Sequence, residues 1–190
     1  MTVAEPHPEQ GTIEAIQQLQ SAYPFATTLL IYCLIERRVK YLVIEERKQP
    51  HAVLLDARWH GELRRQSDTE FIASLTSGWM GLGFIARRFA DATHKATLGT
   101  IAQRRNTYMH ANDLFPPVVE LDREQRSQLH KTELRQAIQD LQRTLDILQD
   151  PYHVTIDHAG KIRDFHPRGP MSYRRLSRTL RPRRHDPPAS

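Results

Sequence analysis

Hydrophobic residues recur at intervals of three and four over most of this chain, the spacing of one face of an α-helix. From Phe25 to about Arg47 the chain has neither glycine nor proline, and Pro24 suits the first turn of a helix. A second strongly periodic segment follows Asp122, a residue type that caps helices well. Its apolar positions alternate in steps of four and three: Leu134, Ile138, Leu141, Leu145 and Leu148. Both segments predict long helices, and the second has the seam of a helical bundle.

The other candidate helices are shorter. Helical spacing predicts them over three ranges: residues 11–20, 69–85 and 93–112. Ser67 or Asp68 suits the cap of the second of these, although the glycines inside it should weaken or bend the helix. Residues 49–67 fit either a loop or short helices.

The pattern changes after Pro151, from helical spacing to alternation. Residues 153–157 and 161–165 alternate on either side of Gly160, which predicts a small β-hairpin. The last 24 residues contain five prolines and seven arginines and almost nothing to bury, so we expect disorder there. The predicted fold is an all-α bundle of four or five helices with a small C-terminal β-hairpin and a disordered basic tail. We divide it into a flexible lead (1–10), a helical domain (11–150), a β-hairpin appendage (151–166) and an arginine- and proline-rich tail (167–190).

Composition narrows the class of protein. With 190 residues, 39% of them hydrophobic and 26% charged, the chain can form one globular domain with a core. Its most apolar run has 11 residues, whereas a membrane-spanning helix needs about 20. The first residues do not resemble a secretory signal and Cys33 has no partner within the chain, so we expect a reducing cytoplasm and no membrane.

Charge is distributed unevenly along the chain. The net charge is +5, and residues 151–190 hold nine Lys and Arg against three Asp. An affinity for polyanions therefore belongs to this segment and not to the helical domain. We expect its arginines to hold the phosphates of RNA, and the candidates are Arg174, Arg175, Arg178, Arg181, Arg183 and Arg184. The alternative is a solvated terminus that only keeps the protein in solution.

Candidate chemistry lies at the end of the helix predicted over 93–112. Arg105 is followed directly by Asn106, and four residues separate it from His110. This spacing alone has little weight, because chance predicts about 3.5 histidines with an arginine at such a distance upstream. Four such histidines occur, namely His94, His110, His130 and His185.

Context distinguishes His110 from the others. The apolar stripe of its helix passes through Arg105, and a guanidinium on a buried face needs a partner. The apolar stripe of the helix over 25–47 passes in the same way through Glu36. We therefore predict an ion pair between Glu36 and Arg105, which would be a structural pair whether or not the arginine acts in catalysis. Polar residues form a second stripe beside Arg105: Gln103, Asn106, Thr107 and His110.

These residue types suit the cleavage of RNA by its own 2′-hydroxyl group. The reaction needs a proton acceptor that titrates near neutral pH and a fixed positive charge for the transition state. His110 can supply the first and Arg105 the second, while Asn106 can orient the imidazole or a phosphate oxygen. For His110, the alternative is a histidine that only interacts with the C-terminal end of its helix.

The helical part of the chain resembles a known family. The Arg-Asn pair followed by His110, the long helix with Glu36 and the leucine-rich helix after Asp122 resemble the HEPN superfamily of helical domains, over about residues 25–150. The resemblance implies a metal-independent ribonuclease of a toxin or defence system, with Arg105, Asn106 and His110 as catalytic residues. It also implies a homodimer and a possible antitoxin or regulatory partner. Some toxins of this family are silenced at a tyrosine two places after the histidine, where this chain has Asn112.

Other kinds of chemistry find little support in the sequence. It contains no HExxH motif and no pair of cysteines, so we expect neither a metal nor another cofactor. The second hypothesis is a noncatalytic helical module that binds RNA or protein, because a bundle with an internal ion pair requires no chemistry.

Overall fold

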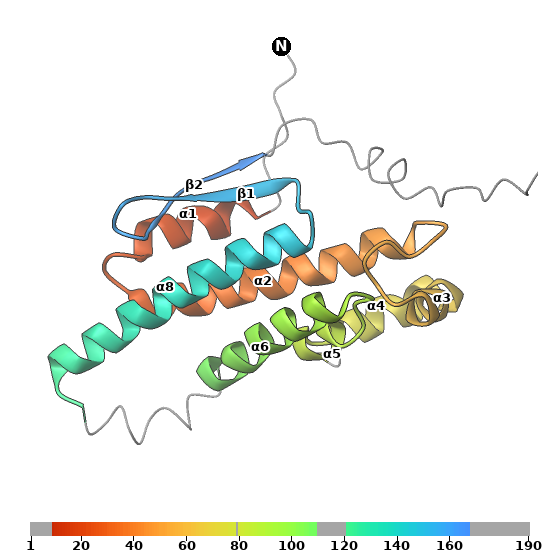
Figure 1. The fold of residues 1–190 in the computed structure, drawn as a ribbon, viewed down its shortest axis with the longest axis horizontal. Helices are drawn as coiled ribbons and strands as arrows, with labels where there is room; N and C mark the ends of the chain where they lie inside the picture. Colours follow the sequence, from red (N-terminus) through yellow and green to blue (C-terminus); the bar gives the residue numbers. More distant parts are fainter. Residues whose placement is uncertain (1–8, 79, 110–120, 168–190) are drawn as a thin grey trace, which may run out of the picture.

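The structure is a computed structural model that describes residues 9–78, 80–109 and 121–167. Within these ranges seven helices precede a two-stranded antiparallel sheet (Figure 1). The helices are α1 (Gln10–Leu19), α2 (Pro24–Arg47), α3 (Ala57–Arg65), α4 (Asp68–Thr76), α5 (Leu82–Ala86), α6 (Ala92–Met109) and α8 (Arg123–Ile147), and the strands are β1 (Tyr152–Ile156) and β2 (Ile162–Pro167). The all-α class and the C-terminal hairpin are confirmed, while the helices of the described ranges outnumber the four or five expected.

One reason for the larger number is the segment 69–85, for which a single helix was the wrong prediction. It forms α4 and α5, separated by Gly78 and Gly81. Gly78 has a φ of +73°, in the left-handed region that a continuous helix of L-residues does not enter. Gly81 has an extended backbone and precedes the first residue of α5. The glycines therefore interrupt this helix and do not merely bend it.

The second reason is the segment 49–67, which contains α3. The buried carboxylate of Glu46 accepts hydrogen bonds from the backbone N–H groups of residues 53–55, at 2.6–3.3 Å, and so folds this loop back onto the end of α2. The side chain of Asp56 then caps α3 by accepting from the N–H groups of Arg58 and Trp59.

Helix α2 lies at the centre of the molecule (Figure 1). It contacts α1, α3, α5, α6 and α8, and this explains why its sequence is apolar over more than one face. Ile31, Ile35, Val39 and Val43 are completely buried. Although α2 is long and largely apolar, no helix of the described ranges has both the length and the hydropathy needed to cross a membrane.

The most extensive helix packing joins α8 to α2. The seam predicted for α8 is confirmed, because the five residues that define it are buried: Leu134, Ile138, Leu141, Leu145 and Leu148. The start of α8 is also as predicted. The side chain of Asp122 accepts from the N–H of Gln125, and the side chain of Gln125 accepts from the N–H of Asp122, which forms a capping box.

The hairpin packs on α1 and on the end of α8 (Figure 1). Its strands pair Val154 with Phe165, and Gly160 in the connecting turn has a φ of +76°. The buried amide of Gln20 joins the hairpin to the end of α1. Its Nε2 donates to the carbonyl of Ile162 at 2.8 Å, and its Oε1 accepts from the N–H of Ile162 at 2.9 Å.

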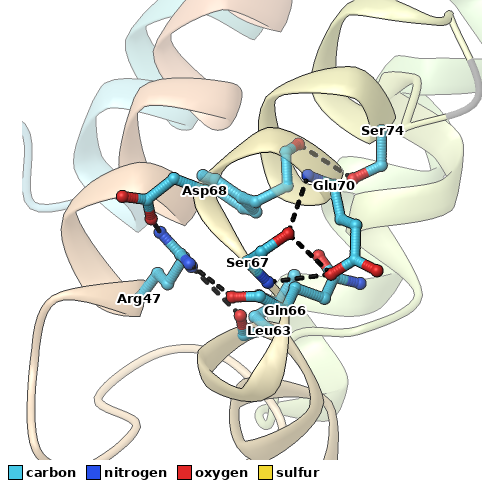
Figure 2. Close-up of polar contacts among 8 residues, drawn as sticks. Arg47, Leu63, Gln66, Ser67, Asp68, Glu70 and Ser74 are labelled. Atoms are coloured by element: carbon cyan, nitrogen blue, oxygen red, sulfur yellow. Dashed lines mark hydrogen bonds and ion pairs between the residues drawn. The ribbon is translucent and has the colours of Figure 1, made fainter.

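The corner between α3 and α4 is fixed by Arg47, the last residue of α2, as Figure 2 shows. Its guanidinium donates to the carbonyl oxygens of Leu63 and Gln66 and contacts Asp68 at 2.6 Å. It also lies over the ring of Phe71. One planar side chain thus holds the end of one short helix and the beginning of the next.

Candidate active site on helix α6

The structure describes two of the three candidate catalytic residues, and both lie near the C-terminal end of α6. Arg105 and Asn106 are in its last two turns. His110 follows α6 in the sequence and lies outside the described residues, as do all six arginines proposed for the tail. The described part of the site therefore consists of Arg105, Asn106 and their surroundings.

Arg105 forms the predicted ion pair with Glu36. Its Nη2 lies 2.6 Å from Oε2 of Glu36, across the boundary between α6 and α2. This Oε2 has no aligned hydrogen-bond donor among the described residues, so the contact is electrostatic. The side chains are 23% and 15% exposed, whereas the apolar stripes predicted a buried pair. Partial exposure leaves the guanidinium accessible to a ligand.

The charged groups around this ion pair sum to a net positive charge. Lys40 lies one turn beyond Glu36 on α2, and its Nζ is 3.1 Å from Oε1 of Glu36. The single carboxylate of Glu36 therefore contacts two cations, Arg105 and Lys40. Nη1 of Arg105 donates to Oδ1 of Asn106 at 3.0 Å, while its Nε is buried without a hydrogen-bond partner among the described residues. The guanidinium is held from two sides, and the cluster of Glu36, Lys40 and Arg105 has one more positive than negative charge.

A second ion pair fixes Arg104, the residue before Arg105. The sequence did not lead us to predict this pair. Asp140 of α8 is completely buried and accepts two hydrogen bonds from Arg104, at 2.7 and 2.9 Å. Gln136 donates to the same carboxylate at 3.0 Å. The hydrogen bonds from Arg104 to Asp140 raise the pKa of the guanidinium. Two consecutive arginines of α6 are thus held by carboxylates from two different helices, which fixes the rotation of α6 about its axis.

The residue pattern did not single out Asp140 in the way that it singled out Glu36. Asp140 lies three residues after Ala137 and four before Thr144, and both of these are buried. A carboxylate on an apolar face was the criterion that identified Glu36. Asp140 does not meet it, because Gln136, Arg143 and Thr144 lie one turn away on the same side of α8.

Aromatic residues pack beside the candidate site. Tyr108 lies between the rings of Phe25 and Tyr32, with ring centroids 5.2 and 6.3 Å apart. Burial raises the pKa of Tyr108 to about 12, and burial followed by the charge of Asp140 raises the pKa of Tyr32. His130 of α8 packs edge-on against Phe25, and its Nδ1 is 3.5 Å from the hydroxyl of Tyr108. His130 therefore lies close to the end of α6.

The polar stripe of α6 forms one wall of an open groove between α5 and α6, with a volume of about 370 Å³. Small residues line part of it, namely Gly83, Gly99 and Ala102. Its polar residues are Arg87, Gln103, Asn106 and Thr107. We call this feature the α5–α6 groove. Since Asn106 lines the groove and also accepts a hydrogen bond from Arg105, the groove reaches the candidate site.

Among the other histidines with an upstream arginine, His94 is in the first turn of α6, where its N–H donates to Asp91. His185 lies outside the described residues. Within the described ranges no three His, Cys, Asp or Glu side chains are grouped so that they could hold a metal ion.

Comparison of the chain with protein families, with curated proteins and with solved structures finds no match. A function is therefore inferred from the residues of this chain and from their geometry.

Proposed function

We propose that the protein is a metal-independent endoribonuclease of HEPN type, acting in a toxin or defence system. One observation supports this most directly. Arg105 is anchored by Glu36, contacts Asn106 and remains partly exposed, five residues before His110 in the sequence. A purely structural ion pair would not need an exposed amide beside the guanidinium or a cationic surplus around it.

In the proposed reaction His110 accepts the proton of a ribose 2′-hydroxyl group. The 2′-oxygen bonds to the adjacent phosphorus, the bond from phosphorus to the 5′-oxygen breaks, and the departing 5′-oxygen takes a proton from solvent. The products are a 2′,3′-cyclic phosphate and a 5′-hydroxyl end. Arg105 stabilises the charge that develops on the phosphoryl oxygens, and Asn106 orients a phosphate oxygen or the imidazole.

The charges around Arg105 fit this role. Glu36 fixes the guanidinium, which lowers the entropy lost when it meets a phosphate. Because Lys40 shares the same carboxylate, the cluster of Glu36, Lys40 and Arg105 carries a net charge of about +1. An anion that approaches Asn106 therefore meets a positive potential.

We further propose that the enzyme is a homodimer whose two sites share one cleft. Two large apolar side chains at the same end of the bundle support this, because Phe25 and Met109 are 36% and 38% exposed and flank Tyr108. Exposed apolar residues next to a polar site are typical of interaction surfaces. An antitoxin or another regulatory protein is a further proposed partner of this end.

The decisive experiment incubates the purified protein with end-labelled RNA in the presence of EDTA. We expect fragments that carry a 2′,3′-cyclic phosphate, and no fragments from His110→Ala, which should keep the wild-type circular dichroism and melting temperature. His130→Ala is the matched control, since this histidine lies near the same end of α6 and has no proposed role in proton transfer. If His130→Ala is inactive and His110→Ala cleaves normally, the site is wrongly assigned. Tight binding of RNA without any cleavage would instead support the noncatalytic module.

A further inference from the structure

Most polar side chains of the α5–α6 groove have no partner among the described side chains. Arg87, Gln103 and Thr107 form no hydrogen bond or ion pair with another described side chain, and all three are exposed. Asn106 uses its Oδ1 for Arg105, and its amide N–H groups donate to no other described residue. The groove thus presents a guanidinium, two amides and a hydroxyl group to a ligand. Such groups hydrogen-bond to phosphate oxygens and to the edges of bases.

The charge of the groove is positive. None of its described lining residues is a carboxylate, and Arg87 contributes a full charge. The adjacent Arg88 is occupied elsewhere, since its guanidinium lies 3.4 Å from the ring centroid of Phe84 and donates to the carbonyl of that residue. Burial, and after it the charge of Arg87, lower the pKa of Arg88. An anion beside Arg87 would relieve this repulsion.

The shape of the groove depends on Gly99, in the middle of α6. Glycine costs a helix about 1 kcal/mol relative to alanine. A Cβ atom at Gly99 would meet no atom within 4 Å, so packing does not explain the glycine. The missing side chain does keep the groove open beside Gln103, which is one turn further along α6.

We propose that the α5–α6 groove binds the substrate RNA as a single strand, with Arg87 on a backbone phosphate and Gln103 and Thr107 on the nucleotide next to the one that is cleaved. This inference rests on the proposed function, because Asn106 connects the groove to Arg105. It assigns binding residues outside the three catalytic candidates. It also predicts that the groove can be closed without disturbing the fold, through Gly99.

The test measures binding separately from cleavage. A fluorescein-labelled single-stranded RNA with 2′-O-methyl groups cannot be cleaved, because its 2′-oxygen has no proton to lose. Its Kd is measured by fluorescence anisotropy for the full chain, over a series of salt concentrations. We expect Arg87→Gln to raise the Kd about tenfold, as the loss of one charge-assisted hydrogen bond does, and to lower the slope of log Kd against log salt by about 0.7.

Substitutions at Gly99 test the groove itself. Gly99→Gln should raise the Kd about tenfold by filling it, Gly99→Glu should raise the Kd further by repelling phosphate, and Gly99→Ala should bind nearly as the wild type does. Gly11→Gln is the matched control, because Gly11 is also in a helix and a Cβ atom there would also meet no atom within 4 Å. Arg65→Gln, at an exposed position of α3 outside the groove and outside residues 151–190, controls for the loss of one charge. Circular dichroism of each variant checks that it is folded.

Several results would overturn the inference. Wild-type affinity of both Arg87→Gln and Gly99→Glu would show that the groove does not hold RNA, and cleavage by the wild type in EDTA would then still support the proposed function. Conversely, the expected increases in Kd together with no cleavage of unmodified RNA would refute the proposed ribonuclease activity. They would still support RNA binding in the α5–α6 groove. Displacement of the labelled RNA by inorganic phosphate at an equal concentration of phosphate groups would assign the groove to a free anion. A wild type that does not bind the labelled RNA would also refute the inference.

Discussion

At the scale of residues, the site is built from charges that are only partly removed from water. Glu36 and Arg105 are 15% and 23% exposed, so their interaction lies between those of surface and buried ion pairs. Surface pairs contribute about 0 to 1 kcal/mol, whereas breaking a buried pair costs about 3 to 5 kcal/mol. The same partial exposure that weakens the pair as a stabilising contact makes the guanidinium available to a phosphate.

We therefore expect Glu36→Ala to lower the free energy of unfolding by about 1 to 3 kcal/mol, because it leaves Arg105 with a buried Nε and no carboxylate. Urea unfolding followed by circular dichroism measures the change. Glu45→Ala, which removes a surface pair with Lys48 at the end of the same helix, is the control and should change stability by less than about 0.5 kcal/mol. Replacing Glu36 and Arg105 together by leucine and methionine should recover part of the loss. Equal effects of Glu36→Ala and Glu45→Ala would show that the ion pair with Arg105 stabilises the fold no more than a surface pair does.

Buried tyrosines beside the site give the protein a pH dependence on the alkaline side. The pKa of Tyr108 is about 12 in the folded protein and about 10 when unfolded, so between these values the folded state holds a proton that the unfolded state releases. The contribution of Tyr108 to the free energy of unfolding is therefore fully present below about pH 10. It is lost as the pH rises toward 12, by about 1 kcal/mol per pH unit. Tyr108→Phe should make this fall less steep in urea titrations from about pH 8 to about pH 11.5. Tyr23→Phe, at a position 62% exposed, should keep the wild-type pH dependence.

Residue patterns predicted one of the two arginine pairs. Glu36 and Arg105 were recognisable because each interrupts an apolar stripe, and the partner of each was the other available charge. Asp140 has mostly polar residues one turn away, and the sequence does not show that Arg104 reaches it and that Arg105 does not. Helical spacing gives the direction in which a side chain points, whereas the distance between two helices depends on all the residues packed between them. The degree of exposure of Arg105 was unpredictable for the same reason.

At the scale of elements, the helices with strong local signals were predictable. Helix α2 has Pro24 at its first position, α8 has a capping box at Asp122, and the hairpin has Gly160 in its turn. The division of residues 69–85 into two helices could not be predicted. A glycine in a sequence indicates flexibility, but it does not indicate the sign of φ that the surrounding packing imposes. Helix α3 depends on Asp56 and on the distant carboxylate of Glu46, so local spacing alone left it ambiguous.

Two glycines should respond to alanine in opposite directions. Gly99→Ala should raise the free energy of unfolding by about 0.5 to 1 kcal/mol, because it is in the middle of a helix with free space around its Cα. Gly78→Ala should lower it by about 1 to 2 kcal/mol, because alanine at a φ of +73° is strained. Thermal melting of the two variants measures both effects. A stabilised Gly78→Ala variant would mean that α4 and α5 can join into one helix.

At the scale of the whole molecule, the helical domain and the basic tail should be separable. Strand β2 ends at Pro167, so a chain that ends there keeps every element of the described fold and loses the seven arginines that follow. We expect it to melt near the wild-type temperature and to bind RNA more weakly, with a salt slope lower by about 0.7 for each phosphate that the tail no longer binds. Cleavage at saturating RNA should persist, and the deficit should appear at low substrate concentration. If the salt slope does not change, the tail does not bind phosphates.

The two hydrogen bonds between Gln20 and Ile162 join residues that are 142 positions apart. Helix α1 contacts both α2 and β2, so the environment of α1 is assembled from the element that follows it directly and from the last element that the structure describes. A ribosome adds roughly 5 to 20 residues per second, and on the order of ten seconds therefore pass between the synthesis of Gln20 and that of Ile162. Until Ile162 has been made, Gln20 cannot form these two hydrogen bonds and β2 cannot cover α1. Among the described elements α1 is synthesised before the others, yet its native contacts can be complete only after β2 has been made.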